Sequence, residues 1–316
     1  MSKKLKFDIS KMMEDFSLSI PSREESYEEA VVNPNSFNFG FRRLVGYDNT
    51  SPFKIPETVC FELPFDRWEW LTSDSYKTED IQEFNNYLNG VLLRSGLESK
   101  EYFIKTGTFS NKFDFEKCHI TDTSQLGDKF LDVFYSDMMF GAGSTPHVVI
   151  REFIPSNTKY YIYHGMPLRR ELRFFWDFDE GKLIGYSLYW HPEDMKQLIK
   201  GMFENDNAIE EFFVNHHVMT EMEIYNDDKF TPLRDYIIFR KFHEENKDDY
   251  EKDLSNIIPK LTEFLLTNKD LTDGPLKGKW SIDIMHEDGE YYLIDAAKME
   301  NSALVNRMVF CDDVEN

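Results

Sequence analysis

The stretch IDIMHEDGEYYLIDAAKMENSALV, residues 282–305, carries the most information about the fold. Within and around it, two segments rich in β-forming residues, Lys279–His286 and Tyr291–Ala296, flank the sequence Glu287-Asp288-Gly289-Glu290. An Asp-Gly pair between two such segments is a strong signal for a tight turn that joins antiparallel strands. The stretch therefore predicts a β-hairpin late in the chain.

Each strand of this hairpin carries one aspartate with an apolar residue on either side, Asp283 in the first strand and Asp295 in the second. Burying a carboxylate without a partner costs free energy. Two carboxylates side by side need a nearby cation, and their hard oxygen atoms suit Mg²⁺ bound together with substrate phosphates. The alternative is that both aspartates face solvent, because alternate residues of a strand point outward.

Outward from the hairpin, the central chain is rich in β-branched and aromatic residues, which favour strands. Strands are expected over 101–106, 147–154, 159–164, 170–178 and 182–190, and helices over 78–95, 192–218 and 247–267. Residues 36–77, with scattered aromatic residues and prolines, suit short strands and turns. Runs of strands followed by runs of helices indicate an α+β fold rather than a doubly wound sheet.

Three further segments carry groups that suit a nucleotide. Lys105 ends an apolar strand before a glycine turn, where its ammonium group could reach a phosphate. Arg173 lies on a predicted strand, and its forked, permanent charge suits a γ-phosphate. The apolar strand that ends at Pro155 could join two lobes and offer backbone groups to an adenine edge. The structural alternatives are an edge lysine with a solvated head, an exposed Glu171–Arg173 ion pair and a plain buried strand.

In chain order, these pieces resemble the ATP-grasp superfamily over about residues 99–310. The segments VVIREFIP (148–155), RRELRFF (169–175) and the hairpin are most similar to one branch of it. That branch contains the eukaryotic cell-division-cycle chaperone that assembles translation initiation factor 2, with phage and bacterial relatives. The resemblance implies an α+β ATP-grasp fold whose two lobes sandwich ATP. The implied domains are an N-terminal lobe and arm (1–98), a small lobe (99–155) and a large lobe (156–316).

The resemblance also implies a role for each matching residue. Lys105 would contact the α- and β-phosphates, and Glu152 and Phe153 would form the hinge at the adenine. Arg173 would face the γ-phosphate as the catalytic arginine. Asp283 and Asp295 would bind Mg²⁺, and the implied cofactors are ATP and Mg²⁺.

The sequence departs from the family at two places. Ala297 stands where the family commonly has an asparagine as a third magnesium ligand, so Asn301 or Glu300 is the candidate to replace it. The usual glycine-rich phosphate loop is also reduced, and Ser110 and Lys112 are the candidates for phosphate contacts there. A second glycine segment, 141–145, has no evident role in the sequence.

Composition limits the partners. The net charge is 36 minus 58, or −22, which repels nucleic acid over the mean surface. The three cysteines, Cys60, Cys118 and Cys311, are odd in number and widely spaced, so they predict neither a disulfide framework nor a zinc site. No stretch reaches the roughly 18 apolar residues of a membrane helix, and the first residues lack the pattern of a secretory signal. A cytoplasmic protein without nucleic-acid or membrane partners is expected.

The implied function is an ATP- and Mg²⁺-dependent carboxylate–amine ligase, acting through an acylphosphate on a peptide, a protein or a small metabolite. Two alternatives stay open. One is an ATP-binding assembly factor that binds a protein partner without turnover, which the missing asparagine at Ala297 favours. The other is a phosphotransferase that uses the same nucleotide site.

Overall fold

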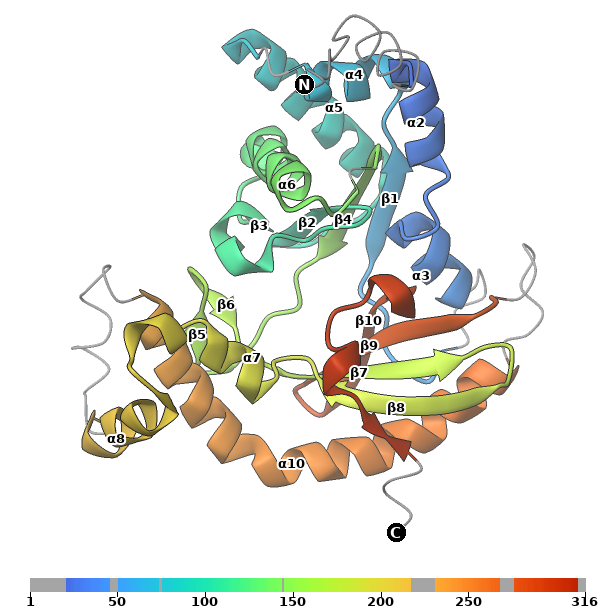
Figure 1. Cartoon of the computed structure of the whole chain (residues 1–316). Helices are drawn as coiled ribbons and strands as arrows, with labels where there is room; N and C mark the ends of the chain where they lie inside the picture. Colours follow the sequence, from blue (N-terminus) through green and yellow to red (C-terminus); the bar gives the residue numbers. More distant parts are fainter. Residues whose placement is uncertain are drawn as a thin grey trace, which may run out of the picture.

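The computed structural model describes residues 21–45, 51–73, 76–143, 145–216, 231–267 and 276–311. Two main antiparallel sheets, of four and five strands, lie one above the other in the view of Figure 1. Helices lie against the upper sheet, and one long helix runs along the lower sheet. The α+β class expected from the sequence is confirmed.

The upper sheet has the strand order β1-β4-β2-β3. Its strands are β1 (Thr58–Glu62), β4 (His147–Glu152), β2 (Tyr102–Thr106) and β3 (His119–Ile120). The helices α5 (Thr78–Ser95) and α6 (Leu126–Phe140) bury apolar side chains at helical spacing against it, among them Phe84, Leu88, Phe130 and Phe134. We call this sheet with α5 and α6 the small lobe. Because β1 pairs with β4, the expected boundary between residues 98 and 99 runs inside this one sheet.

The lower sheet has the strand order β10-β9-β7-β8-β11. Its strands are β7 (Arg170–Asp177), β8 (Lys182–Leu188), β9 (Lys279–Glu287), β10 (Glu290–Lys298) and β11 (Val309–Phe310). One face of β7 and β9 is apolar and packs with the helix α10 (Thr231–Thr267) in a single core. We call this sheet with α10 the large lobe. The helix expected over 247–267 thus begins earlier, at Thr231, and continues through Pro259.

The N-terminal part of the chain is mainly helical, although only short strands and turns were expected over 36–77. It forms α2 (Arg23–Val31), α3 (Phe37–Val45) and α4 (Phe65–Thr72), with β1 between α3 and α4. Phe37, Phe41 and Leu44 recur at helical spacing and are buried in the large-lobe core, which explains why α3 is a helix. Lys54 also accepts a backbone hydrogen bond from Leu293, so this region joins the edge of β10.

Two other expectations needed correction. The strand expected over 159–164 is reduced to β5 (Tyr161–Ile162), which pairs with β6 (Met166–Pro167). The helix expected over 192–218 is divided into α7 (Pro192–Gln197), a short 3-10 turn at Lys200–Met202 and α8 (Asp206–His216), and residues 217–218 lie outside the described residues. Further 3-10 turns are η1 (Lys112–Lys117), η2 (Thr123–Gln125), η5 (Met299–Asn301) and η6 (Val305–Arg307). Among the described helices, none combines the length and the apolar character that crossing a membrane requires.

We expect the free energy of unfolding to fall when the pH drops below about 6.5, the pKa of an unperturbed histidine. Burial lowers the pKa of His147, which lies within 2.9 Å of Ser36 Oγ through its Nδ1 atom. The unfolded chain therefore binds the proton first, and stability present above pH 6.5 is lost as the pH falls towards the folded-state pKa. This residue alone accounts for up to about 1.4 kcal/mol per pH unit in that window.

Urea unfolding at pH 7.5 and pH 5.5 measures this effect. His147→Asn is the comparison variant, because an asparagine amide can replace the Nδ1 contact without titrating. A pH dependence of equal size in the variant would show that His147 does not contribute. Burial also lowers the pKa of His191, His243 and His286, so part of the dependence remains in the variant.

Candidate functional site

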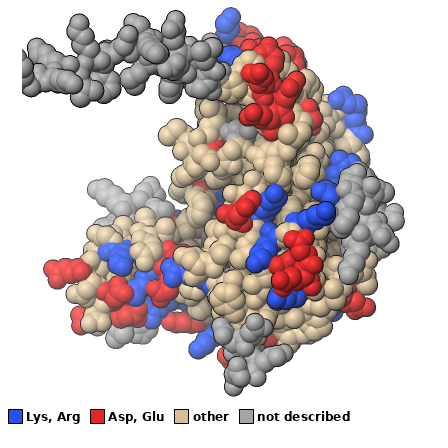
Figure 2. Space-filling view, turned by 45° about the vertical axis from the view of Figure 1, so that its right-hand side comes forward, with Lys and Arg blue, Asp and Glu red and all other residues tan. Residues whose placement is uncertain are grey.

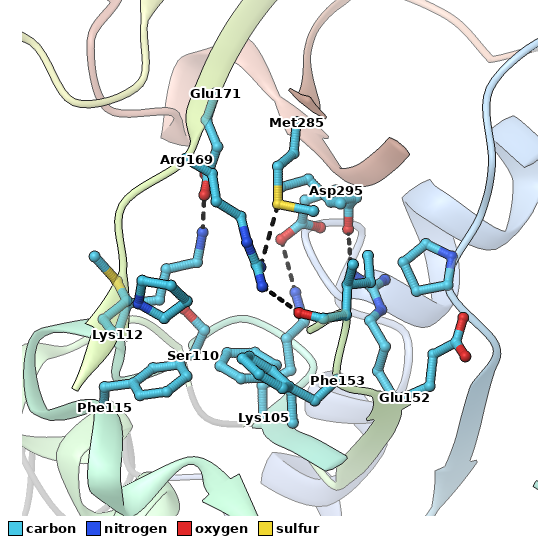
Figure 3. A pocket seen from close by; sticks show the side chains of 17 residues that line it. Lys105, Ser110, Lys112, Phe115, Glu152, Phe153, Arg169, Glu171, Met285 and Asp295 are labelled. Atoms are coloured by element: carbon cyan, nitrogen blue, oxygen red, sulfur yellow. Dashed lines mark hydrogen bonds and ion pairs between the residues drawn. The ribbon is translucent and has the colours of Figure 1, made fainter. Parts of the chain in front are cut away.

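A cleft of about 680 Å³ opens between the two lobes. The small lobe contributes Lys105 from β2, Ser110 and Lys112 from the following turn, and Glu152 and Phe153 from the end of β4 (Figure 3). The large lobe contributes the other wall, which includes Arg169, Glu171, Met285, Ile294 and Asp295. The cleft therefore gathers five of the predicted site residues of the small lobe and one of the predicted magnesium ligands.

Three charged residues form a row across adjacent strands of the large lobe. Arg173 on β7 is the register partner of Asp283 on β9, and Asp283 is the register partner of Asp295 on β10. Register partners of an antiparallel pair lie on the same face of the sheet. The apolar neighbours of this row, Phe174 and Ile282, lie on the opposite face in the core. The row therefore faces away from α10, on the side of the small lobe.

A β-bulge places Asp295 in this row. Leu293 pairs with Ile284 and Asp295 pairs with Asp283, so Ile294 is an extra residue in β10. Without the bulge, strict alternation would put Asp295 on the core face, because an extra residue reverses the direction of the side chains that follow. The carbonyl of Ile294 accepts a hydrogen bond of 2.6 Å from Arg151 Nη1 on β4, so the bulge also contacts the small lobe.

Each of the two aspartates is held by a cation. Arg173 donates two hydrogen bonds of 2.7 Å to Asp283, one from Nε and one from Nη2. Lys105 Nζ lies 2.7 Å from Asp295 Oδ2 and thereby joins β2 of the small lobe to β10 of the large lobe. Lys105 and Asp283 are almost fully buried, whereas the side chain of Asp295 is 38% exposed. The side chain of Asp295 is therefore partly accessible from the cleft that it lines.

The charges around Asp295 shift the pKa values of the site. Burial alone would raise the pKa of the Asp295 carboxyl, but Lys105, Arg151 and Lys112 outweigh burial and hold that pKa below its usual range. Burial lowers the pKa of Lys105, against the opposing effect of Asp295. Burial likewise lowers the pKa of Arg151 to about 10. Cationic groups thus share a confined space with too few anions, which favours binding of an anionic ligand.

Lys112 and Glu171 form a second contact across the cleft. Lys112 Nζ lies 3.4 Å from Glu171 Oε2 and 4.3 Å from the centre of the Tyr189 ring. The guanidinium of Arg173 lies over the same ring at 4.8 Å. Tyr189 therefore forms cation–π contacts with two of the predicted phosphate-contacting cations.

At Glu152 and Phe153, the expected hinge, both backbone N–H groups already donate hydrogen bonds within the protein. The backbone N–H of Glu152 donates to Glu57 O, and that of Phe153 donates to Glu101 O, both at 2.9 Å. The side chain of Phe153 lines the cleft beneath the Arg169 guanidinium, 5.2 Å from its ring centre. These two residues can therefore offer a ring face, a side chain and carbonyl groups to a base, but not their N–H groups.

Asn301, the predicted third magnesium ligand, does not line the cleft. It is exposed at the end of η5, and its Nδ2 donates a hydrogen bond of 2.9 Å to Asn35 Oδ1. Ala297 is the register partner of Ser281 and supplies no side-chain ligand. Neither Asn301 nor Ala297 therefore places a further side-chain oxygen beside Asp283 and Asp295.

The sequence interpretation missed Arg151, Arg169 and Met285, which all line the cleft. Arg169 reaches across the cleft, where Nη1 contacts Met285 Sδ at 3.4 Å and Nη2 donates to the carbonyl of Ile154 (Figure 3). A usable signal existed for Arg151, because it stands inside the apolar run 148–154. A charged residue in a buried strand needs a nearby partner or ligand.

The charges of this cleft suit an anionic ligand. Its lining holds four cationic side chains (Lys105, Lys112, Arg151 and Arg169) against three carboxylates (Glu152, Glu171 and Asp295) in a chain of net charge −22. Figure 2 shows Lys and Arg side chains gathered near the middle of one face of the molecule, beside acidic ones. Adjacent carboxylates next to a cationic pocket suit a divalent ion that bridges protein and phosphate.

Several solved structures are similar to this chain. C-terminally truncated Cdc123 from Schizosaccharomyces pombe is 15% identical, with 94% of this chain and 93% of that chain covered and a TM-score of 0.43. The D-alanine–D-alanine ligase of Bacillus anthracis, complexed with ATP, is 10% identical, with 100% of this chain and 71% of that chain covered and a TM-score of 0.33. No family model and no curated protein matches the sequence of this chain.

Another similar structure belongs to a protein with a known partner. It is the C-terminal domain of Kluyveromyces lactis Pby1, described as an ATP-grasp enzyme that interacts with the mRNA decapping enzyme Dcp2. That domain is 11% identical to this chain, with 86% of this chain and 67% of that chain covered and a TM-score of 0.34.

Proposed function

We propose that the cleft binds ATP with Mg²⁺ and that the protein uses it to join a carboxylate to an amine. The observation that supports this proposal is the row Arg173–Asp283–Asp295 with Lys105 paired to its last member. The row combines two oxygen ligands for a metal ion with cations for phosphates. ATP supplies anionic phosphates for these cations, which neutral or cationic ligands do not.

The residues of the cleft and of the row would have different roles toward ATP and Mg²⁺. Lys105 and Lys112 hold phosphate oxygens, and Arg173 faces the terminal phosphate, where a forked cation stabilises developing negative charge. Asp283 and Asp295 hold Mg²⁺, which when bound neutralises charge on the phosphates. Asn301 would have to release Asn35 before it could act as a third ligand.

The reaction proceeds in two displacements. An oxygen of the substrate carboxylate attacks the γ-phosphorus, the bond from that phosphorus to the β–γ bridging oxygen breaks, and ADP leaves. The amine then attacks the acyl carbon, inorganic phosphate leaves with the acyl oxygen, and the amine loses a proton to form the amide. Positioning and charge neutralisation account for most of such catalysis, so no side-chain nucleophile is needed.

Nucleotide binding can be tested by thermal unfolding. ATP with Mg²⁺ at 100 times its Kd is expected to stabilise the folded chain by about 2.7 kcal/mol, which raises the melting temperature. ATP with a chelator should stabilise less, because Asp283 and Asp295 would then face the phosphates without a metal ion. An unchanged melting temperature with ATP and Mg²⁺ at millimolar concentrations would rule the proposal out.

The reaction products distinguish a ligase from the two alternative functions. Release of ADP and phosphate that depends on both a carboxylate and an amine supports the ligase. Retention of the phosphoryl group on an acceptor indicates a phosphotransferase. Tight ATP binding without turnover indicates an assembly factor, the second candidate, which Ala297 favours because a third side-chain ligand is absent at that position.

A further inference from the structure

The turn that follows β2 connects three cleft residues. It begins after Lys105 and leads to Ser110 and Lys112, all of which line the cleft. Thr106 closes the turn, since its N–H donates to Phe109 O at 2.9 Å and its Oγ1 accepts from the Phe109 N–H at 2.9 Å. The positions of Ser110 and Lys112 relative to Lys105 therefore depend on how this turn is held. We refer to residues 106–110 as the phosphate turn.

The buried carboxylate of Asp137, on α6, is hydrogen-bonded to the phosphate turn. Oδ2 of Asp137 accepts hydrogen bonds from the hydroxyls of Thr106 and Thr108, the latter at 3.1 Å. Asp137 is fully buried, and among the described residues its Oδ1 has no hydrogen-bond partner. No lysine or arginine of the described residues forms an ion pair with it. Burial of a carboxylate with so few partners is costly, so its presence at this place calls for a role.

The second glycine segment of the sequence supports the same turn. Thr108 Oγ1 lies 3.2 Å from the carbonyl of Gly143, an alternative acceptor for its single hydroxyl proton. Gly107 has no room for a side chain, because a Cβ atom there would lie 2.4 Å from Thr145 Oγ1 and 2.3 Å from Ser36 Oγ. The turn is thus enclosed by α6, by Gly143 and Thr145, and by the start of α3, whose Phe37 N–H donates to Gly107 O at 2.7 Å.

We propose that Asp137 is a positioning residue for the triphosphate: by binding Thr106 and Thr108 it fixes the turn that presents Lys105, Ser110 and Lys112 to the phosphates. Asp137 does not itself line the cleft. Its effect therefore passes through the backbone of the turn, and it should change the affinity for phosphates without changing the affinity for the nucleoside. This inference rests on the proposed ATP binding.

The test compares the affinities of ATP·Mg²⁺ and adenosine in the full chain by calorimetry. Asp137→Ala should weaken ATP·Mg²⁺ by about tenfold, as expected for the loss of hydrogen bonds to a charged group, and leave adenosine unchanged. Asp137→Asn keeps an oxygen acceptor for both hydroxyls and should stay within about threefold of the wild type. Asp132→Ala, an exposed aspartate on the same helix, is the matched control and should change neither affinity.

Several outcomes would overturn the inference. Equal loss of ATP and adenosine in Asp137→Ala would show a general structural role, and unchanged ATP affinity would show no role in binding. If Asp137→Ala does not fold, Thr108→Val removes one of the two donors and should weaken ATP by about threefold while adenosine is unaffected. The ATP affinity of the wild-type chain is measured before that of any variant. A wild-type chain that binds no ATP would instead refute the proposed function.

Discussion

Asp295→Asn is expected to reduce the Mg²⁺-dependent affinity for ATP by about 100-fold or more. The substitution removes the partly exposed carboxylate at the end of the row. Mutating even a residue that only contacts a metal ligand commonly lowers metal affinity 10- to 100-fold. Calorimetric titration of ATP with and without Mg²⁺ measures the change. An affinity equal to that of the wild type in Mg²⁺ would remove Asp295 from the metal site.

The same variant is also expected to lose stability. Lys105 is 5% exposed and would keep a buried charge without its counter-ion. Because Asp295 is partly exposed, we expect a cost of about 1–3 kcal/mol, below the usual range for breaking a fully buried pair. The double variant Lys105→Met/Asp295→Asn removes both charges and should recover much of this stability without recovering ATP binding. Recovery of ATP binding in the double variant would show that the Lys105–Asp295 pair is not part of the nucleotide site.

Arg173→Met is expected to have the largest effect on stability, about 3–5 kcal/mol. It leaves Asp283, which is 3% exposed and accepts two hydrogen bonds from Arg173, as an unpaired buried carboxylate. Turnover should be lost as well, because the forked cation facing the terminal phosphate is gone. Urea unfolding and ADP release measure the two effects separately.

Two further variants distinguish the structural role of Arg173 from its chemical role. Arg173→Met/Asp283→Leu removes the whole pair and should recover stability but not turnover. Lys182→Met, in the exposed Lys182–Glu180 pair of the neighbouring strand β8, is the control and should cost less than about 1 kcal/mol. Turnover in the Arg173→Met/Asp283→Leu variant at the wild-type rate would contradict the assignment of Arg173 to the terminal phosphate.

Local signals in the sequence were sufficient for much of the fold. The Asp-Gly turn predicted the β9–β10 hairpin, and the β-branched and aromatic residues of 170–178 and 182–190 predicted β7 and β8. The helix α3 was missed although Phe37, Phe41 and Leu44 recur at helical spacing, because the prolines and other aromatic residues of 36–77 favoured short strands and turns. Tertiary contact, and not local propensity, decides the structure of such a short segment.

The candidate site was only partly predictable. Lys105, Arg173, Asp283 and Asp295 could be selected because each is a charged residue in an apolar strand. Their pairing could not, since Lys105 and Asp295 are 190 residues apart and meet only when the two lobes come together. Asp137 gave no signal at all, because an aspartate near the end of a helix is ordinary until its burial is seen.

The bulge at Ile294 bears on how such sites can be recognised in other chains. Around a two-residue turn, residues that face one another are always an odd number of positions apart, as Leu293 and Ile284 are. Asp283 and Asp295 are separated by an even number, so no regular hairpin with a two-residue turn could bring them face to face. A search for two acids at regular hairpin spacing would therefore overlook this pair, and a one-residue deletion in β10 could dismantle the site with every acidic residue still in the sequence.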